Sequence, residues 1–552
     1  MKMVLTEDRG GRETYDYVIV GAGTAGCVLA NRLSESPDTS VLLLEAGRTD
    51  VSPFVRLPVG FVRTPPKTNW SYVPEPDPSR DGRVEEWPAG RILGGSSSVN
   101  ATGWMRGSPA DYDAWPSSER TRWDYEAVLP YLRRSERAEN GGAGRGRTGR
   151  IRVRDAGVGH RLIDAFIEGA GQRGHRRRED MNRGVNDGAG AMQVAQRRGF
   201  RSSSATAYLT PARRRRNLRL RTGVTVRRVV IDRGRATGIE YVAGDRIVTV
   251  DVRREVVLAA GAIGSPRLLL LSGAGPADEL RAKGIAVVAD LPEVGANLQE
   301  HARASVVFSA RIPTLNQDLN PRGVVKHGLD FLLRGRGAAT TAPACAVVLA
   351  KLHETSTRPD FQFLFAPFAV APAKPQNAAY EGYRDVTVPT DPRMTASVWL
   401  NHPRSTGSVR LRSADPADRP VIDHVMFKDP DDLADLVAGI RMVREIFRSE
   451  ALGPYTGGEI APGDAIRSDE QLGEYLRSRS AVGHHPVGTC RMGADDRSVV
   501  DLELRVRGVE GLRVADASVI PSLVSGGTYA PVVMVGERAA DLIRSRAEGR
   551  QS

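Results

Sequence analysis

The chain opens on an apolar run, a glycine-rich turn and a helical stretch: YDYVIVGAGTAG, residues 15–26. Tyr15–Val20 has the β-branched, apolar character of a buried parallel strand, and Ala25–Leu33 is expected to form a helix. A second apolar run, Ser40–Glu45, ends in an acid. Strand, glycine turn, helix and strand in this order predict a Rossmann-like unit in an α/β fold.

The glycine turn has the chemistry of a dinucleotide cradle. Gly21, Gly23 and Gly26 permit a tight turn, the close approach of a pyrophosphate, and close packing of helix on strand. Thr24 and Ala25 begin the helix, whose free N–H groups and positive dipole end favour phosphate. We therefore expect all five residues to bind the cofactor.

The acid at the end of the second strand is expected to bind a ribose. Glu45 follows Gly26 by about 19 residues, near the spacing of the ribose-binding acid in such units. A carboxylate accepts hydrogen bonds from ribose hydroxyls and repels a 2′-phosphate. Ala46, next to Glu45, is expected to lie against the same part of the cofactor.

The bulk composition describes a globular chain long enough for more than one domain. It has 552 residues, 40% of them apolar, and a net charge of +12. Arginine runs such as Arg213–Arg216 raise the alternative of nucleic-acid binding. The basic residues are spread along the chain without interleaved aromatic residues, so we interpret them as solvated surface and expect no nucleic-acid partner.

Nothing in the sequence indicates a membrane span or a secretory route. No window holds the roughly 18 continuous apolar residues of a spanning helix. The first residues, Met1–Arg12, are charged and lack an apolar core segment. Three scattered cysteines, Cys27, Cys345 and Cys490, are too few for a disulfide framework or a zinc site. We therefore expect a cytoplasmic protein.

Three further stretches carry a family resemblance. They are GRILGGSSSVN at 90–100, GAIGSP at 261–266 with its continuation to Gly275, and VADASVIP at 514–521. With the opening turn, they make the chain similar to the glucose–methanol–choline (GMC) oxidoreductase family from Tyr15 to Ile543. Ala274, where a larger aliphatic residue is usual, is the one departure in the second stretch.

The resemblance implies FAD as the cofactor. It places Gly95, Ser96, Asn100 and Ala101 along the flavin and assigns Arg91, from the same signature, to the cofactor site. It also implies that Val224, in an expected strand Leu220–Val226, holds the adenine through its backbone. Asp516 would bind the ribityl–pyrophosphate stretch and Ala517 would lie beside the flavin. Because the first signature has no histidine, we expect the FAD to be non-covalent.

The resemblance also implies two interleaved domains. Residues 12–155, 219–310 and 478–548 would form a Rossmann-like FAD-binding domain. Residues 156–218 and 311–477 would form an α+β substrate domain with an antiparallel sheet. The runs 360–365, 396–400 and 408–411 are expected as strands of that sheet, and 433–447 as a helix. Residues 140–150, rich in glycine and arginine, are expected to form a mobile surface loop.

The candidate base lies in HHPVGTC, residues 484–490. Oxidising an alcohol moves a hydride to flavin N5 and a proton to a base, and imidazole has a suitable pKa. By resemblance, the residue just before Pro486 is the catalytic base, which makes it His485. His484 is expected to be structural.

A second expected catalytic residue departs from the family pattern. Relatives usually carry a second histidine or an asparagine in a Gly-Asn-Thr-Asn-Ala-Pro run, whereas this chain reads SGGTYAP at 525–531. We assign that position to Tyr529, whose hydroxyl is expected to orient a substrate oxygen beside His485.

The sequence therefore predicts an FAD-dependent dehydrogenase or oxidase that acts on a small-molecule alcohol, with oxygen or another electron acceptor. The alternatives are a non-redox or light-driven enzyme on the same scaffold (a hydroxynitrile lyase or a fatty-acid photodecarboxylase) and an inactive FAD-binding protein. The apolar, aromatic run at 360–366 shows no acidic anchor for a quaternary ammonium group. This disfavours choline itself.

Overall fold

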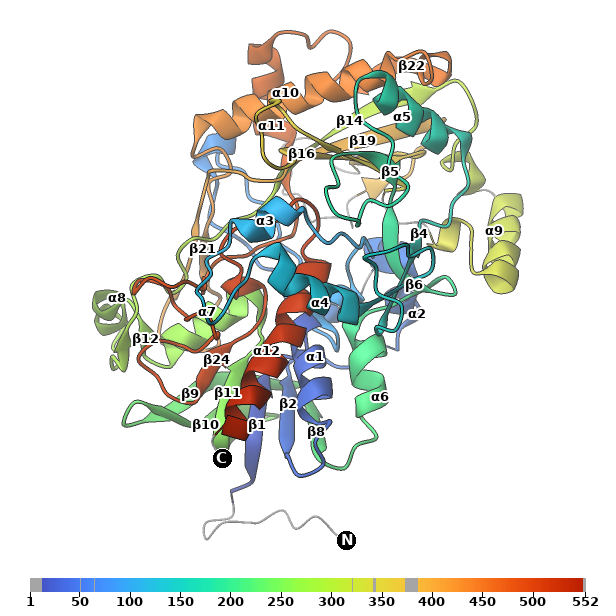
Figure 1. Cartoon of the computed structure of the whole chain (residues 1–552). Coiled ribbons are helices and arrows are strands. Elements are labelled where there is room, and N and C mark those ends of the chain that lie inside the picture. Colours follow the sequence, from blue (N-terminus) through green and yellow to red (C-terminus); the bar gives the residue numbers. More distant parts are fainter. Residues whose placement is uncertain are drawn as a thin grey trace.

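Two sheets, one above the other, organise the molecule (Figure 1). The structure is a computed structural model, and it describes residues 12–49, 51–63, 65–319, 321–340, 344–372 and 386–549. β1 and the C-terminal end of α12 (Tyr529–Gly549) both lie in the lower half. No helix in the described part of the chain is long and apolar enough to cross a bilayer.

The lower sheet begins as the predicted Rossmann-like unit. β1 pairs in parallel with β2 and with β11, and β2 pairs in parallel with β8. β11 is long enough to leave this parallel region and pair antiparallel with β10, which pairs with β9. In sheet order the strands are β8 (Leu218–Thr222), β2 (Val41–Glu45), β1 (Thr14–Val20), β11 (Arg246–Leu258), β10 (Arg235–Ala243) and β9 (Val224–Asp232), with β24 (Leu512–Val514) beside β11.

Apolar burial explains why the opening residues form these strands. Val18, Ile19, Leu42 and Leu43 are completely buried, as expected for a parallel sheet covered on both faces. The expected strand at 220–226 is instead two strands, because Gly223 adopts a positive φ of 71° and breaks it. The long helices of this half are α1 (Thr24–Leu33), α4 (Tyr125–Ser135), α7 (Gly261–Leu271) and α12, and α1 packs on α12.

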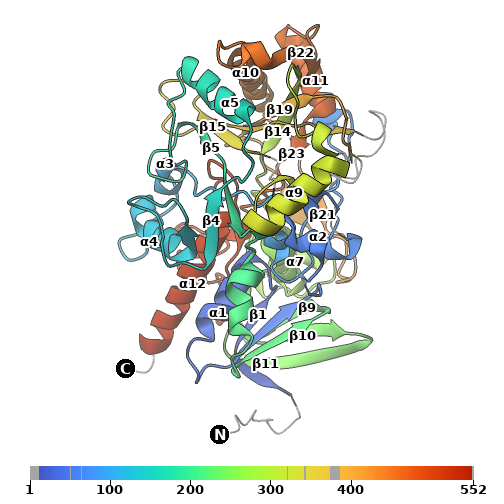
Figure 2. The ribbon, with the colours of Figure 1, turned by 90° about the vertical axis from the view of Figure 1, so that its right-hand side faces the viewer.

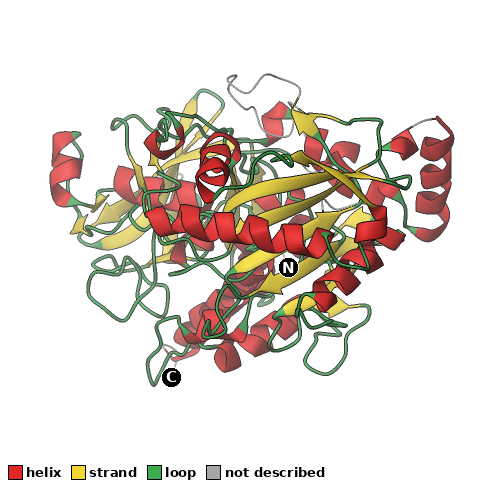
Figure 3. Cartoon of the chain, turned by 90° about the horizontal axis from the view of Figure 1, so that it is seen from above, coloured by secondary structure: helices red, strands yellow, loops and turns green. Residues whose placement is uncertain are grey.

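The upper sheet is antiparallel and alternates in side-chain direction. Phe361, Phe363 and Phe365 are fully buried in one core cluster with residues of the covering helices. Figure 3 shows α10 (Pro430–Phe447) lying across the strands, and Figure 2 shows α5 (Arg161–Gln172) on the same side. The strand order is β22 (Thr456–Ala461), β14 (Ala302–Ala310), β19 (Arg393–Leu400), β16 (Phe361–Ala366), β15 (Ala346–Ala350) and β5 (Gly188–Ala191), with β23 (Ala481–Val482) beside β14.

The predicted fold class is confirmed, although the proposed strands and boundaries need adjustment. β20 (Ser408–Arg410), expected in the large antiparallel sheet, pairs instead with β21 (Val421–Asp423) in a separate two-stranded sheet. β14 and β23 lie in segments assigned to the FAD domain, yet they pair within the antiparallel sheet. The division into two interleaved domains therefore stays a prediction. The remaining long helices are α9 (Pro321–Arg334) and α11 (Asp469–Arg479).

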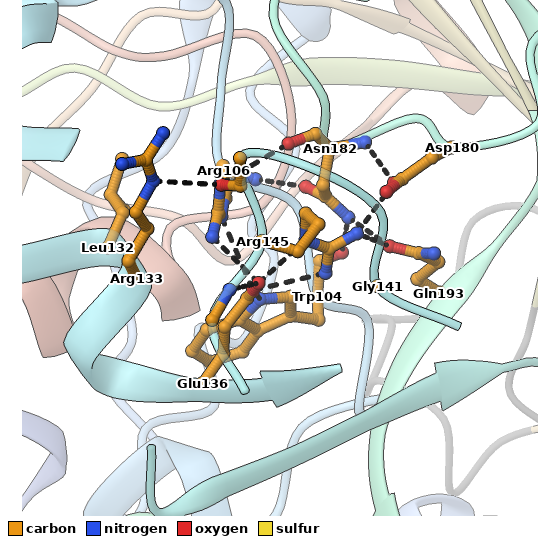
Figure 4. Close-up of polar contacts among 12 residues, drawn as sticks. Trp104, Arg106, Leu132, Arg133, Glu136, Gly141, Arg145, Asp180, Asn182 and Gln193 are labelled. Atoms are coloured by element: carbon orange, nitrogen blue, oxygen red, sulfur yellow. Dashed lines mark hydrogen bonds and ion pairs between the residues drawn. The ribbon is translucent and has the colours of Figure 1, made fainter. Parts of the chain in front are cut away.

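Residues 140–150 include a buried anchor, which differs from the mobile loop that composition predicts. Arg145 is buried and donates hydrogen bonds to Glu136, Asp180 and Gln193 (Figure 4). Glu136 also accepts from Arg106 and from the indole nitrogen of Trp104, at 2.7 and 2.8 Å. Burial alone would raise the pKa of Glu136, but the two arginines hold it below its usual range. The cluster fixes Trp104, whose ring packs edge-on against the ring of Tyr529.

Candidate active site

A cavity of about 650 Å³ lies between the two sheets. Its floor includes Val20, Glu45 and Ala259, which stand at or just after the carboxyl ends of β1, β2 and β11. Open α/β sheets bind ligands at this edge, where the strand order reverses. Its other side is formed by β14, β16 and β19 of the antiparallel sheet.

Most of the residues predicted to bind the cofactor line this cavity. Gly26 and Arg91 do not: Gly26 is buried in α1, and the Arg91 guanidinium lies 4.8 Å from the centroid of the Trp70 ring. The predicted residues on the lining are Gly21, Gly23, Thr24, Ala25, Glu45, Ala46, Gly95, Ser96, Asn100, Ala101, Val224, Asp516 and Ala517.

The two glycine-rich loops leave no room for side chains at Gly26 and Gly95. A Cβ on Gly26 would lie 1.9 Å from the carbonyl oxygen of Gly21, and one on Gly95 would lie 2.7 Å from Cα of Gly23. Gly21 also has a positive φ of 99°. Gly23 itself has an ordinary φ of −75°. The two glycine-rich loops thus pack backbone against backbone beside the start of α1, which fits a pyrophosphate held by N–H groups.

Glu45, the predicted ribose-binding acid, lies on the lining of the cavity. It is buried, and its two carboxylate oxygens each accept one backbone N–H, from Ala22 at 2.8 Å and from Gly47 at 2.7 Å. Each oxygen keeps a further lone pair for a hydroxyl. Burial raises the pKa of Glu45 to about 7, against the lowering effect of these donors.

The carboxylate of Asp516 already has hydrogen-bond partners within the protein for both of its oxygens. One oxygen accepts from the backbone N–H of Gly261 and the hydroxyl of Ser265, and the other accepts twice from Ser518. The carboxylate therefore joins the start of α7 to the turn at 516–519. We expect Asp516 to contact the cofactor through its backbone, because its oxygens are filled.

His485 is positioned by two segments that lie far apart in sequence. Gly483 and Val487 hydrogen-bond to His301 and Gln299, so residues 483–487 run alongside residues 299–301. The backbone N–H of His485 donates to both oxygens of Glu300, each at 2.8 Å. The Nδ1 atoms of His301 and His485 lie 3.0 Å apart.

The contact between the two imidazoles sets which nitrogen of His485 is free to act as a base. The two facing Nδ1 atoms share one proton, so one of them donates and the other accepts. In the tautomer with that proton on Nδ1 of His485, Nε2 of His485 carries a lone pair beside Gly527, as a general base requires.

Electrostatics keep His485 neutral. Burial lowers the pKa of His485 to about 4, and the positive charge of Arg303 adds to the effect. The pKa of His484 is also lowered, first by burial and then by Arg303. His484 lines the cavity and adopts a positive φ of 65°, so its backbone turns where the chain enters the site.

The expected role of Tyr529 has to be revised. Its side chain is buried, and its hydroxyl donates to the backbone carbonyl of Ser202 at 2.9 Å. Its ring packs edge-on against Trp104, with centroids 5.1 Å apart. The residue opposite His485 is Gly527, where a Cβ would lie 3.5 Å from Nε2. In the family run Gly-Asn-Thr-Asn-Ala-Pro, Gly527 stands at the first asparagine position and Tyr529 at the second. Gly527 is the residue that faces His485.

Sequence reasoning missed several groups of the site. Glu300 and His301 follow a short polar segment with no motif of its own, and only the chain pairing brings them to His485. Arg303 and Trp399 are separated by nearly a hundred residues but stand opposite each other on β14 and β19. The one signal that the sequence offers for His301 is that it is a histidine close to an apolar strand.

Comparisons with known proteins agree with this geometry. Residues 15–303 and 403–536 both match the family described as GMC oxidoreductase. The chain is 40% identical to mitochondrial choline dehydrogenase of Mus musculus, over 97% of this chain and 90% of the relative. It is 38% identical to oxygen-dependent choline dehydrogenase of Brucella anthropi, over 96% of each. The crystal structure of pyridoxine 4-oxidase from Mesorbium loti superposes with a TM-score of 0.85 at 30% identity, covering 96% of this chain and 98% of that one.

The glycine turn yields a test of cofactor binding. The backbone of Gly23 accepts a side chain, since a Cβ there meets only the carbonyl oxygen of Ala259, at 3.7 Å. Gly23→Val should fold but project a branched side chain into the cavity, so the purified protein should contain little flavin. Absorbance of the supernatant after denaturation measures the released flavin. Wild type should release its flavin into the supernatant, because we expect no covalent bond between the flavin and the protein.

The matched control is Gly171→Ala, on α5, where a Cβ meets nothing within 4 Å. It should retain the flavin content of wild type. Full flavin in the Gly23→Val protein would mean that this turn does not hold the cofactor.

The revised position of Tyr529 gives a second test. Tyr529→Phe removes only the hydroxyl that bonds to the Ser202 carbonyl, which leaves that oxygen unsatisfied and should cost about 1–3 kcal/mol of unfolding free energy. The rate of flavin reduction should stay within about threefold of wild type. This is smaller than a tenfold change, which corresponds to about 1.4 kcal/mol of activation free energy. A much slower reductive half-reaction in a stable Tyr529→Phe protein would restore the catalytic role that the sequence predicts.

Proposed function

The chain belongs to the GMC oxidoreductase family, and from this membership we propose that His485 is the base of an alcohol oxidation. The protein is an FAD-dependent oxidoreductase that acts on CH–OH groups. The alternatives of a lyase or a photodecarboxylase gain nothing from the three relatives named above, which are all dehydrogenases or oxidases.

The observation that carries the proposal is the orientation of His485. Its Nδ1 faces His301 at 3.0 Å, and its Nε2 faces the cavity beside Gly527. A substrate hydroxyl in the cavity donates its proton to Nε2, while bound FAD supplies the hydride acceptor, flavin N5. His301 contacts the imidazole and Glu300 anchors the backbone of His485, so together they fix the direction of the base.

The cofactor residues keep distinct proposed roles. The turn at Gly21–Ala25 would hold the pyrophosphate and Glu45 the ribose. The loop with Gly95, Ser96, Asn100 and Ala101 would lie along the flavin ring, where the glycine backbone permits close approach. Val224, at the start of β9, would meet the adenine. We propose that FAD is held without a covalent bond, because residues 90–107 contain no histidine.

Two further points belong to the proposal. Electrons leave the reduced enzyme to oxygen or to another acceptor, and admitting oxygen after anaerobic reduction distinguishes an oxidase from a dehydrogenase. We place the protein in the cytoplasm, because Cys27, Cys345 and Cys490 are all buried and no disulfide joins them.

The role of His485 predicts a specific loss. His485→Ala should retain FAD, since no predicted cofactor contact uses its ring, and should slow anaerobic reduction of the flavin by about 10²–10⁴-fold. Stopped-flow absorbance with an alcohol in excess measures this directly.

His484→Asn is the control, because asparagine tolerates the positive φ at that position. Its reductive rate should remain close to that of wild type. The assignment is overturned if His484→Asn is the slower of the two.

The pKa of His485 predicts the pH dependence. The base is active when neutral, and its pKa is lowered from the ordinary 6.5 to about 4 by burial and by Arg303. The rate of flavin reduction should therefore be flat near neutral pH and fall only as pH drops through the lowered pKa. An acid limb centred at or above the ordinary histidine value would contradict this electrostatic account.

A further inference from the structure

A second cavity, of about 1060 Å³, lies apart from the candidate active site and shares none of its described lining residues. It opens to solvent, because Arg197, Arg198 and Phe200 on its lining are exposed. One wall is a small four-stranded sheet, whose middle strands are labelled in Figure 1. In sheet order the strands are β3 (Glu136–Ala138), β4 (Ile151–Asp155), β6 (Gln193–Arg197) and β7 (Phe200–Arg201).

The described lining of this second cavity carries many arginines and no acidic residue. Arg32 and Arg134 form ion pairs with carboxylates that lie outside the lining. Other arginines of the lining have no ion pair with a carboxylate among the described residues: Arg137, Arg150, Arg152, Arg197, Arg198 and Arg201. The sequence spreads these residues along the chain, whereas the fold gathers them around one space, which we call the arginine cavity.

Strand register sets two of these arginines directly against each other. Arg137 on β3 is paired with Arg152 on β4, and both line the arginine cavity. Ile151 and Val153 point to the other face of the sheet and are buried in the core of the lower half. Like charges directly opposite each other on neighbouring strands destabilise a sheet. An anion that binds between them would offset this repulsion.

The electrostatics of Arg152 agree with this geometry. Burial lowers the pKa of Arg152, and the positive charges of Arg137 and Arg197 lower it further. Glu139 acts in the opposite direction but does not line the cavity. The sheet wall of the arginine cavity therefore has a positive potential, which attracts anions from solution.

Arg201 connects the arginine cavity with the loop that is predicted to lie along the flavin. Its guanidinium is buried, with Nε donating to the carbonyl oxygen of Val55 at 2.9 Å and Nη1 donating to Oδ1 of Asn100 at 2.6 Å. Nη2 is also buried, and no described residue accepts a hydrogen bond from it. Burial lowers the pKa of Arg201 to about 10. Because Arg201 lines the arginine cavity and Asn100 lines the active-site cavity, a charge bound in the first acts on a residue of the second.

The shape and chemistry of the arginine cavity favour a small ligand with several phosphate groups. Its volume is at the upper end of the range for small-molecule sites. Guanidinium groups bind phosphate oxygens through paired N–H donors, and several arginines call for more than one phosphate. Single-stranded nucleic acid fits less well, because it stacks its bases on aromatic rings and Phe200 is the one aromatic residue on the described lining.

We propose that the arginine cavity is a regulatory site for a small molecule with several phosphate groups. Arg137, Arg152 and Arg197 hold the phosphates, and Arg201 carries the effect of binding to Asn100. The step is binding alone, so no bond forms or breaks. The site has its own lining and does not depend on the proposed alcohol oxidation.

The test titrates inorganic tripolyphosphate into the FAD-loaded protein at low ionic strength and follows the heat of binding by calorimetry. Loading with FAD keeps the probe out of the proposed pyrophosphate site at residues 21–25. Binding should be saturable and should weaken as salt is added. The bound probe should also raise the unfolding temperature and change the absorbance spectrum of the flavin.

Substitutions in the sheet wall should remove the site. Arg152→Gln and Arg197→Gln should each weaken binding by about tenfold or more, the usual effect of losing a hydrogen bond between charged groups. Arg152→Gln should fold, because it removes one of two opposed charges. Arg246→Gln is the matched control with the same change in net charge, since Arg246 is exposed in the β10–β11 hairpin outside the lining. It should bind the probe as wild type does.

A further variant tests the connection to the flavin. Arg201→Lys should still bind tripolyphosphate, but with a smaller change in the flavin spectrum. The single amine of lysine cannot contact the Val55 carbonyl and Asn100 at the same time, as the guanidinium does. Saturable binding to wild type that leaves the flavin spectrum unchanged would overturn the connection through Arg201.

Other outcomes would overturn the site itself. They are the absence of saturable tripolyphosphate binding, and an equal loss of affinity in Arg246→Gln and Arg152→Gln, which would mean attraction to net charge alone. Binding of a single-stranded oligonucleotide or of anionic phospholipid vesicles, with no saturable binding of tripolyphosphate, would assign the arginines to a macromolecular surface instead. None of these results bears on whether an alcohol reduces the flavin.

Discussion

The active site depends on one backbone pairing, between residues 299–303 and residues 481–487. Hydrogen bonds between Gly483 and His301, between Val487 and Gln299, and between β14 and β23 hold these segments together. The pairing sets His485 against His301 and Glu300, and it sets Arg303 on the same side of the cavity. It joins the antiparallel sheet to the segment that carries the base. The direction of the imidazole that we propose as the base is therefore fixed by main-chain geometry and not by side-chain contacts alone.

The sequence predicts the cofactor half of this site better than the substrate half. The apolar strands around Val18 and Leu42 are buried on both faces, so their hydrophobic pattern is visible without the fold. Gly21 is constrained by its positive φ and Gly26 by the nearby carbonyl oxygen of Gly21, and both constraints leave a local signature in the sequence. Such features depend on residues close in sequence, and the residues predicted from them at 21–25 and 45–46 contribute to the cavity lining or its packing. The remaining cofactor residues, including Arg91, were implied by the family resemblance.

The substrate half depends on long-range register, which a single sequence does not display. Which face of β16 meets the cavity decides whether Phe363 or Leu364 lines it, and that choice is made by the helices above the sheet. Tyr529 was assigned to the family's second position, but the helix α12 begins at this residue and directs its hydroxyl to Ser202. Arg303 has no motif at all, and its meaning comes from its place opposite Trp399. Family membership therefore establishes the chemistry of the enzyme, while the register of the antiparallel sheet decides which side chains line the cavity.

The most direct measurement is a crystal structure of the FAD-loaded protein with a bound alcohol analogue that cannot be oxidised. The account predicts that Nε2 of His485 faces the ligand atom that takes the place of the hydroxyl oxygen, over the flavin ring. A His485 ring directed away from the flavin and the ligand would contradict it.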